Sequence, residues 1–493
     1  MRQPRAISHD SVTMAGHSAT EAMSAQAKVA TDAALAREGG LRRQLHSRQI
    51  SMLAIGGAIG TGFFLGSAVS IQLAGPAVML SYAGGSLIAL ALMWALGEMT
   101  VAHPVAGSFG VFAELYLHPW AGFAVRYSYW LGQAIAIGSE VIAASIYCRL
   151  WFPRIPGWIW IVAFSVALVY VNARAVGNFG LFEYWFAFIK VATICVFLVL
   201  GAALLLGIGF PRIGAANYTA HGGFLPHGWG GAALGVAMAV FSFIGIEVVA
   251  VASGETAQPE VAIPRALRWT LARLALFYVG GMAILVGVMP WTQLGLSESP
   301  FVRVFQNVGI PYTAGIMNFV VLTAALSSMN CNLYLDTRML FSLARGGYAP
   351  RSLGNLNAHG APLPALLISS VGMAIALVLE LRFKDTAFLY MLGMAFFCGL
   401  FAWILIFLTH LFFRRHYTRK PGTALPARFA PRSAWTSVAG LLALVGVLIS
   451  TWWIPGMRIT ITAGLPWLGF ITVCYFVFAR HRRPTAPEET PHG

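Results

Sequence analysis

The sequence has few charged residues and very few acidic ones. Only 10% of its 493 residues are Asp, Glu, Lys or Arg, with 17 acidic residues against 32 basic. A water-soluble globular chain carries about 25% charged residues, so the composition excludes a soluble fold. Because 58% of the residues are hydrophobic, most of the chain is expected to lie in lipid.

Cysteine is scarce, and no CxxC pair occurs, so the sequence indicates neither a disulfide framework nor a zinc site. It also lacks the GxxxxGK[ST] loop that binds nucleotide phosphates. No nucleophile, base and metal constellation typical of a hydrolase stands out, and no channel filter loop does either. We therefore expect no enzyme activity, no cofactor and no metal. The five cysteines are expected to be packing residues: Cys148, Cys195, Cys331, Cys398 and Cys474.

Long apolar runs recur through the chain, and a helix needs roughly 20 such residues to cross a bilayer. Their continuous hydrophobicity excludes a β-barrel, whose strands alternate apolar and polar residues. The pattern predicts an all-α polytopic membrane protein with 12 transmembrane helices, at 51–73, 77–102, 122–151, 157–173, 182–209, 230–253, 269–290, 312–336, 363–381, 387–412, 435–453 and 460–479.

The positive charges are distributed unequally between the predicted loops. With the amino terminus inside, 24 of the 32 Lys and Arg residues are cytoplasmic and seven lie on the other face. Cytoplasmic loops retain positive charge, so both termini are predicted to be cytoplasmic. The formal charge of +15 is thereby explained by topology and by contact with anionic membrane lipid, and no nucleic acid partner is expected.

Two of the predicted spans carry interruptions near mid-membrane. The first has four glycines within 56–62, and each glycine inside a helix costs about 1 kcal/mol relative to alanine. The sixth is irregular at 241–247. Small residues also serve close helix packing, but breaks in spans one and six, at corresponding places in two five-span halves, are typical of an inverted-repeat transporter.

Unwound helices suit an amino acid, because free amides attract its carboxylate and free carbonyls its ammonium. The first break offers amides from its glycine-rich segment, and the second offers carbonyls. The predicted substrate-binding residues at the breaks and on span three are Ala58, Ile59, Gly60, Thr61, Gly62, Gln133, Phe241, Ser242, Phe243, Ile244 and Ile246.

Several motifs together resemble the bacterial amino acid permeases of the amino acid-polyamine-organocation superfamily. They lie at 41–45, 55–62, 97–98, 104–109, 183–185, 241–247, 254–255, 259–260, 263–266, 326–328 and 337–340. The resemblance covers roughly residues 41 to 480. It implies a LeuT-type core of spans one to ten in two inverted repeats, two peripheral spans, and proton-coupled uptake of amino acids.

With this resemblance, the chain divides into four predicted regions. Residues 1–48 form a polar, disordered cytoplasmic tail, and 49–412 form the ten-helix core with repeats at about 51–209 and 230–412. Peripheral helices 11 and 12 occupy 413–480, and 481–493 form a cytoplasmic tail.

Ionisable residues inside spans are functional candidates, since one at a helix centre costs about 2.5 to 3.5 kcal/mol on insertion scales. Related permeases carry an acid near Glu140, which implies a role in the site or in proton coupling. Lys190 is surrounded by apolar residues, where burial disfavours the charged ammonium, so it could take up and release a proton. In relatives with this fold a cation bridges spans one and eight, and we expect Lys190 to substitute for it.

Four other polar positions receive different predictions. Glu247 is expected to hold the broken sixth span, and Glu98 to contact a gate or loop. His410 and Asp336 are expected to be interfacial. The cytoplasmic segment 254–268 is interpreted either as a solvated connection or as a gate.

These observations predict a secondary active transporter that takes up amino acids across a bacterial inner membrane. A neutral amino acid is favoured, with a cationic amino acid permease or an exchanger as alternatives. Plausible specificity positions are Gln133, Ile137, Glu140, Ile246, Ser328 and Phe397. A non-transporting amino acid sensor is the alternative of another class. The sequence indicates no oligomeric state.

Overall fold

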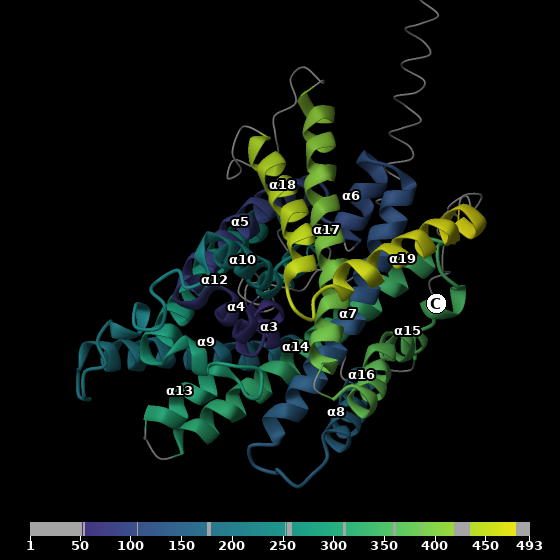
Figure 1. The fold of residues 1–493 in the computed structure, drawn as a ribbon. Helices are drawn as coiled ribbons and strands as arrows, with labels where there is room; N and C mark the ends of the chain where they lie inside the picture. The colour runs from purple at the N-terminus through teal and green to yellow at the C-terminus, as the bar shows by residue number, and fades with distance from the viewer. Residues whose placement is uncertain are drawn as a thin grey trace, which may run out of the picture.

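The computed structural model of this chain consists of helices, and it has no strand among the residues that it describes. These are residues 52, 55–105, 107–174, 179–251, 253, 259–308, 312–357, 361–384, 386–418 and 434–479. Within them, 11 helical stretches are long and apolar enough to cross a membrane. The described chain is therefore an all-α polytopic membrane protein, as predicted (Figure 1).

The long helices overlap the predicted spans, and their ends differ from the predicted ones by up to about ten residues. They are α5 (Val78–Ala102), α7 (Pro119–Cys148), α8 (Gly157–Arg174), α9 (Phe179–Leu206), α10 (Gly228–Phe243), α12 (Pro259–Val288), α14 (Thr313–Arg345), α16 (Val371–Arg382), α17 (Ala387–Thr418), α18 (Trp435–Ser450) and α19 (Ile459–Cys474). Shorter helices are α3 (Thr61–Phe64), α4 (Ser67–Ala74), α6 (Ser108–Tyr116), α11 (Val248–Val251), α13 (Pro300–Val308) and α15 (Leu363–Ser369).

The first two predicted spans lie within one continuous candidate stretch of 42 residues. Ser70 in α4 and Ser81 in α5 donate hydrogen bonds to the carbonyls of Gly235 (2.9 Å) and Ala232 (2.7 Å), one turn apart on α10. Between the two helices, Gly75 has a φ of 59°, which glycine adopts without a Cβ clash. The chain thus reverses direction at Gly75, and α4 and α5 both contact the same turn of α10. This stretch therefore holds two helices.

Two helices, α6 and α13, lie outside the predicted spans and were not expected. Helix α13 has nine residues and is too short to cross a bilayer. Phe301 and Phe305 lie one turn apart on its buried face, and the Phe301 ring lies 4.9 Å from that of Phe63. This short amphipathic helix therefore packs its apolar face against the first span.

The helices differ in how much apolar surface they expose. Most of α7 is buried inside the protein, whereas α9 and α18 carry exposed side chains such as Val199 (71%) and Leu442 (67%). Figure 1 shows α7 and α17 in the middle of the bundle and α18 beside α17. Exposed apolar faces on membrane-length helices are surfaces for lipid.

Candidate functional site

The predicted break in the first span lies between Ala58 and Thr61. A helical turn at 55–58 ends there, Gly60 adopts an extended backbone (φ −128°, ψ −155°), and α3 begins at Thr61. The first amides of a helix have no acceptor within it. The break therefore presents the N–H groups of Thr61 and Gly62, and the prediction of an interrupted span is confirmed.

The sixth span is also broken where predicted. Helix α10 ends at Phe243, Ile244 is extended (ψ 134°), and Gly245 has a φ of 110°, a conformation for which glycine is the favoured residue. The Oε2 atom of Glu247 accepts hydrogen bonds from the Gly245 amide (3.0 Å) and from the Trp403 indole (3.3 Å). Glu247 therefore holds the broken helix, as expected.

The two breaks lie against each other. The Ser242 hydroxyl donates to the Gly62 carbonyl at 3.0 Å, and a Cβ placed on Gly245 would lie 2.8 Å from the Gly57 carbonyl oxygen. Only a residue without a side chain permits this approach of the two backbones. Segments about 180 positions apart in the sequence thus form one structure.

A cavity opens where the two breaks meet. About 560 Å³ at this place is free of protein atoms, and part of that space is open to solvent. Eight of the predicted substrate-binding residues line it: Ala58, Gly60, Thr61, Gly62, Gln133, Phe241, Ser242 and Ile244. The remaining three, Ile59, Phe243 and Ile246, are fully buried and are not among the lining residues.

Glu140 brings a carboxylate to the cavity wall from α7. It is 6% exposed, and its Oε1 accepts a hydrogen bond of 2.5 Å from the Ser328 hydroxyl on α14. A Cβ on Gly60 would lie 2.9 Å from the same oxygen. The carboxylate therefore lies directly beside the backbone of the first break.

Three polar residues of the cavity were missed by the sequence reasoning: Tyr129, Ser139 and Asn332. All three line it, and Asn332 Oδ1 is buried with no hydrogen-bond partner in the described part of the chain. Asn332 lies one helical turn after Ser328, so a polar pair at i, i+4 within an apolar span was the available signal. The other unpredicted lining residues are Gly57, Gly132, Ala136, Ala395 and Gly399.

Lys190 lies outside the cavity lining, on α9. It is 1% exposed, and its Nζ donates to the Gly56 carbonyl at 2.8 Å. The contact reaches the first span just before its break, so the lysine is connected to the site through the backbone.

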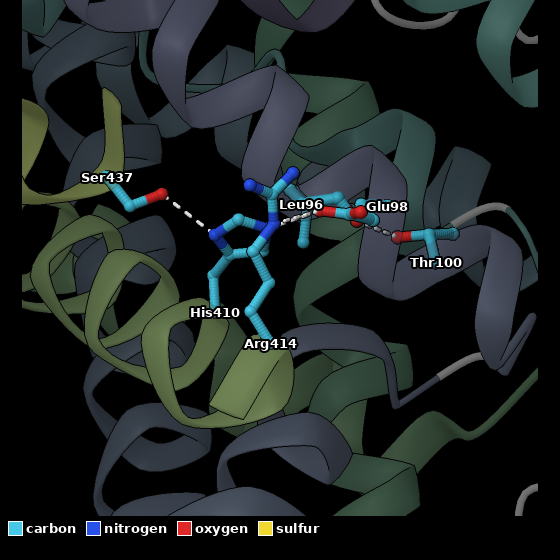
Figure 2. Close-up of polar contacts among 6 residues, drawn as sticks. All are labelled: Leu96, Glu98, Thr100, His410, Arg414 and Ser437. Carbon is cyan, nitrogen blue, oxygen red and sulfur yellow. Dashed lines mark hydrogen bonds and ion pairs between the residues drawn. The ribbon is translucent and has the colours of Figure 1, made fainter. Parts of the chain in front are cut away.

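A second buried polar cluster joins α5, α17 and α18 (Figure 2). Glu98 Oε2 accepts from His410 Nε2 (2.6 Å) and Arg414 Nε (2.8 Å), while His410 Nδ1 lies 2.8 Å from the Ser437 hydroxyl. All four residues are at most 5% exposed. Glu98 therefore bonds to a helix rather than to a loop.

Two polar residues that were expected near the membrane interface are buried inside the protein. His410 and Asp336 are 2% and 0% exposed, and their depth in the membrane stays a prediction. Helix α14 continues nine residues past the predicted span end at 336, which places Asp336 within the helix rather than at its terminus.

The architecture defines a multi-pass helical membrane protein with a small cavity at two helix breaks. Residues 49–488 match the amino acid permease family, and the chain belongs to that family. It is 39% identical over 437 residues to the aromatic amino acid transport protein AroP of Salmonella typhimurium (strain SL1344), covering 88% of this chain and 95% of that protein. It is 36% identical over 447 residues to the gamma-aminobutyric acid permease of Bacillus subtilis (strain 168), covering 90% and 95%. A further relative from that strain is the uncharacterized amino acid permease YtnA, 36% identical over 449 residues, 90% of this chain and 97% of that protein.

Proposed function

We propose that the protein takes up a neutral amino acid by proton symport across the bacterial inner membrane. The observation that carries the proposal is the cavity at the meeting point of two broken helices, lined by backbone and by Glu140. The excess of Lys and Arg in the predicted inner loops supports a topology with both termini in the cytoplasm.

The first break is the proposed site for the substrate carboxylate. The amides of Thr61 and Gly62 begin a helix, where partial positive charge favours an anion. Gly60 keeps the approach open, because a Cβ there would lie 2.7 Å from the Ser328 hydroxyl. The ammonium group of the substrate is assigned to the side of the cavity that carries Glu140 and the Asn332 oxygen.

The rest of the cavity favours an uncharged substrate side chain. Ala136, Ala395, Phe241 and Ile244 supply apolar or small walls, and Glu140 is already hydrogen bonded to Ser328. The named substrates of the relatives, aromatic amino acids and gamma-aminobutyric acid, are the first candidates. A cationic amino acid would need Glu140 to pair with its side chain, and Glu140 would then no longer be free to bind the backbone ammonium group of the substrate.

Proton coupling is assigned to Lys190 together with Glu140. A buried ammonium is disfavoured by loss of hydration, and the Gly56 carbonyl is an acceptor only for a nitrogen that carries a hydrogen. Protonation of Lys190 would strengthen its bond to the first span. Its charge state thereby acts on the break that holds the substrate carboxylate.

The test is uptake of radiolabelled amino acids into proteoliposomes that contain the purified protein. The panel includes aromatic, small neutral and cationic amino acids and gamma-aminobutyric acid, with and without an imposed inward proton gradient. We expect gradient-driven accumulation of a neutral amino acid that a protonophore abolishes. Counterflow without accumulation would identify an exchanger, binding without flux a sensor, and no interaction with any amino acid would refute the proposal.

A further inference from the structure

Tyr278 of α12 contacts both broken helices at once. Its hydroxyl lies 2.8 Å from the carbonyl oxygen of Ala58 and 2.8 Å from that of Ser242. Ala58 ends the helical turn before the first break, and Ser242 is the next-to-last residue of α10. Carbonyls at helix ends lack a partner within their own helix, and that of Ala58 also accepts from the Gly60 amide in the break at 3.1 Å. One phenol O–H thus lies within hydrogen-bond distance of both helix ends.

The phenol acts from behind the cavity rather than inside it. Ala58 and Ser242 line the cavity, whereas Tyr278 is fully buried and is not among the lining residues. Its ring is held by neighbours of both breaks: it stacks on Phe63 at 4.3 Å and contacts Phe243 at 4.7 Å. The hydroxyl is thereby aimed at the two carbonyls by packing.

We propose that Tyr278 is a positioning residue for substrate binding, whose hydroxyl fixes the separation of the two helix ends that form the site. This inference rests on the proposed function. The Tyr278 hydroxyl touches no substrate. It acts through the Ala58 and Ser242 carbonyls, which carry the backbone of both breaks on either side of the cavity.

The consequence concerns affinity rather than selectivity. The first break is assigned to the carboxylate, and the side of the cavity with Glu140 and Asn332 to the ammonium, both of which every amino acid shares. Small walls such as Ala136 on α7 and Ala395 on α17 face the variable part. Loosening the two helix ends should therefore weaken binding of all substrates by the same factor. The order of preference among substrates should stay unchanged.

The test uses Tyr278→Phe, which removes one oxygen and keeps the stacked ring. The matched control is Tyr218→Phe, because the Tyr218 hydroxyl donates to the Ala283 carbonyl of the same helix at 2.9 Å but is not among the cavity residues. We expect about tenfold weaker binding in Tyr278→Phe, a factor that corresponds to about 1.4 kcal/mol. The substrate-free melting temperature should match that of the control.

A second readout needs no substrate. Hydrogen–deuterium exchange of the substrate-free protein should rise in peptides covering 55–66 and 241–251 together in Tyr278→Phe, and in neither for Tyr218→Phe. Unchanged exchange at both breaks, a changed substrate preference, or an equal loss of affinity in the control would each overturn the inference. If the wild type binds no amino acid, the proposed function fails, and the exchange measurement still decides whether Tyr278 ties the breaks.

Discussion

Lys190 Nζ donates a hydrogen bond to the carbonyl oxygen of Gly56 over 2.8 Å, and so joins α9 to the first span just before its break. The lysine is 1% exposed. A protonated Lys190 would bind this carbonyl more strongly than a neutral one, because a charged donor forms the stronger hydrogen bond. In the proposed mechanism, this contact would carry the effect of proton binding to the substrate site.

The first prediction is that Lys190→Met uncouples transport from the proton gradient. Methionine keeps most of the length of the side chain but has no titratable nitrogen. We expect accumulation driven by a pH gradient to fall at least about tenfold, while exchange of internal for external substrate continues. Uptake and counterflow into proteoliposomes measure the two activities separately.

The control for this prediction is Lys384→Met. Lys384 is exposed in the turn after α16, and its removal should leave both activities unchanged. Lys190→Met protein that accumulates substrate with the pH dependence of the wild type would contradict the assignment.

The second prediction concerns Gly60. In Gly60→Ala, the new Cβ would lie 2.7 Å from the Ser328 hydroxyl and 2.9 Å from Glu140 Oε1, so the polar wall of the cavity must shift. We expect at least about a tenfold loss of affinity, measured by substrate-induced thermal stabilisation. Gly446→Ala is the control, because a Cβ there meets nothing within 4 Å and alanine favours a helix by about 1 kcal/mol. Wild-type affinity in Gly60→Ala would remove this residue from the site.

The features that could be predicted from the sequence are those that depend on residues close together in the chain. Span lengths follow from apolar runs, and the two breaks follow from the glycines at 56–62 and the irregular segment at 241–247. Glu247 could be assigned because its partner, the Gly245 amide, is two residues away. Each of these signals lies within a few residues of the feature that it predicts.

What could not be predicted depends on how the helices rotate and pair. Tyr129 and Asn332 face the cavity only because α7 and α14 present those faces. Glu98 and His410 are 312 positions apart, and no local pattern relates them. Hydropathy also did not predict α13, because its nine residues are too few to form a membrane span.

The third prediction concerns the pH dependence of stability at the end of α5. His103 lies just past the last helical residue, with its Nε2 atom 2.6 Å from the Tyr116 hydroxyl. Burial, and then the nearby charge of His416, lower the pKa of His103 below its ordinary value. The unfolded chain, with a histidine pKa of about 6.5, then binds a proton more readily than the folded one, so stability falls as the pH drops below that value.

We expect the melting temperature of the wild type to fall between about pH 7 and pH 5.5, and that of His103→Gln to fall less. Glutamine stays neutral and can still hydrogen bond to Tyr116. His221→Gln, at an exposed position, serves as the control and should follow the wild type. Parallel curves for wild type and His103→Gln would refute the assignment.

The last prediction tests the cluster of Glu98, His410 and Arg414. Glu98 is 0% exposed, and its Oε2 accepts hydrogen bonds from His410 and Arg414. Glu98→Gln therefore removes the carboxylate while the Arg414 side chain stays buried. Breaking a buried ion pair by removing one partner costs about 3–5 kcal/mol, and we expect a large drop in melting temperature. Substituting both Glu98→Gln and Arg414→Gln should cost less than the sum of the single changes, because no charge is then left without its partner.

The control for this prediction is Glu298→Gln, whose partner Arg303 is 41% exposed at the side chain, where an ion pair contributes about 1 kcal/mol or less. Thermal unfolding of the purified variants measures all four. Additive effects of the two buried substitutions, or a loss no larger than that of Glu298→Gln, would show that the cluster does not hold α17 to α5.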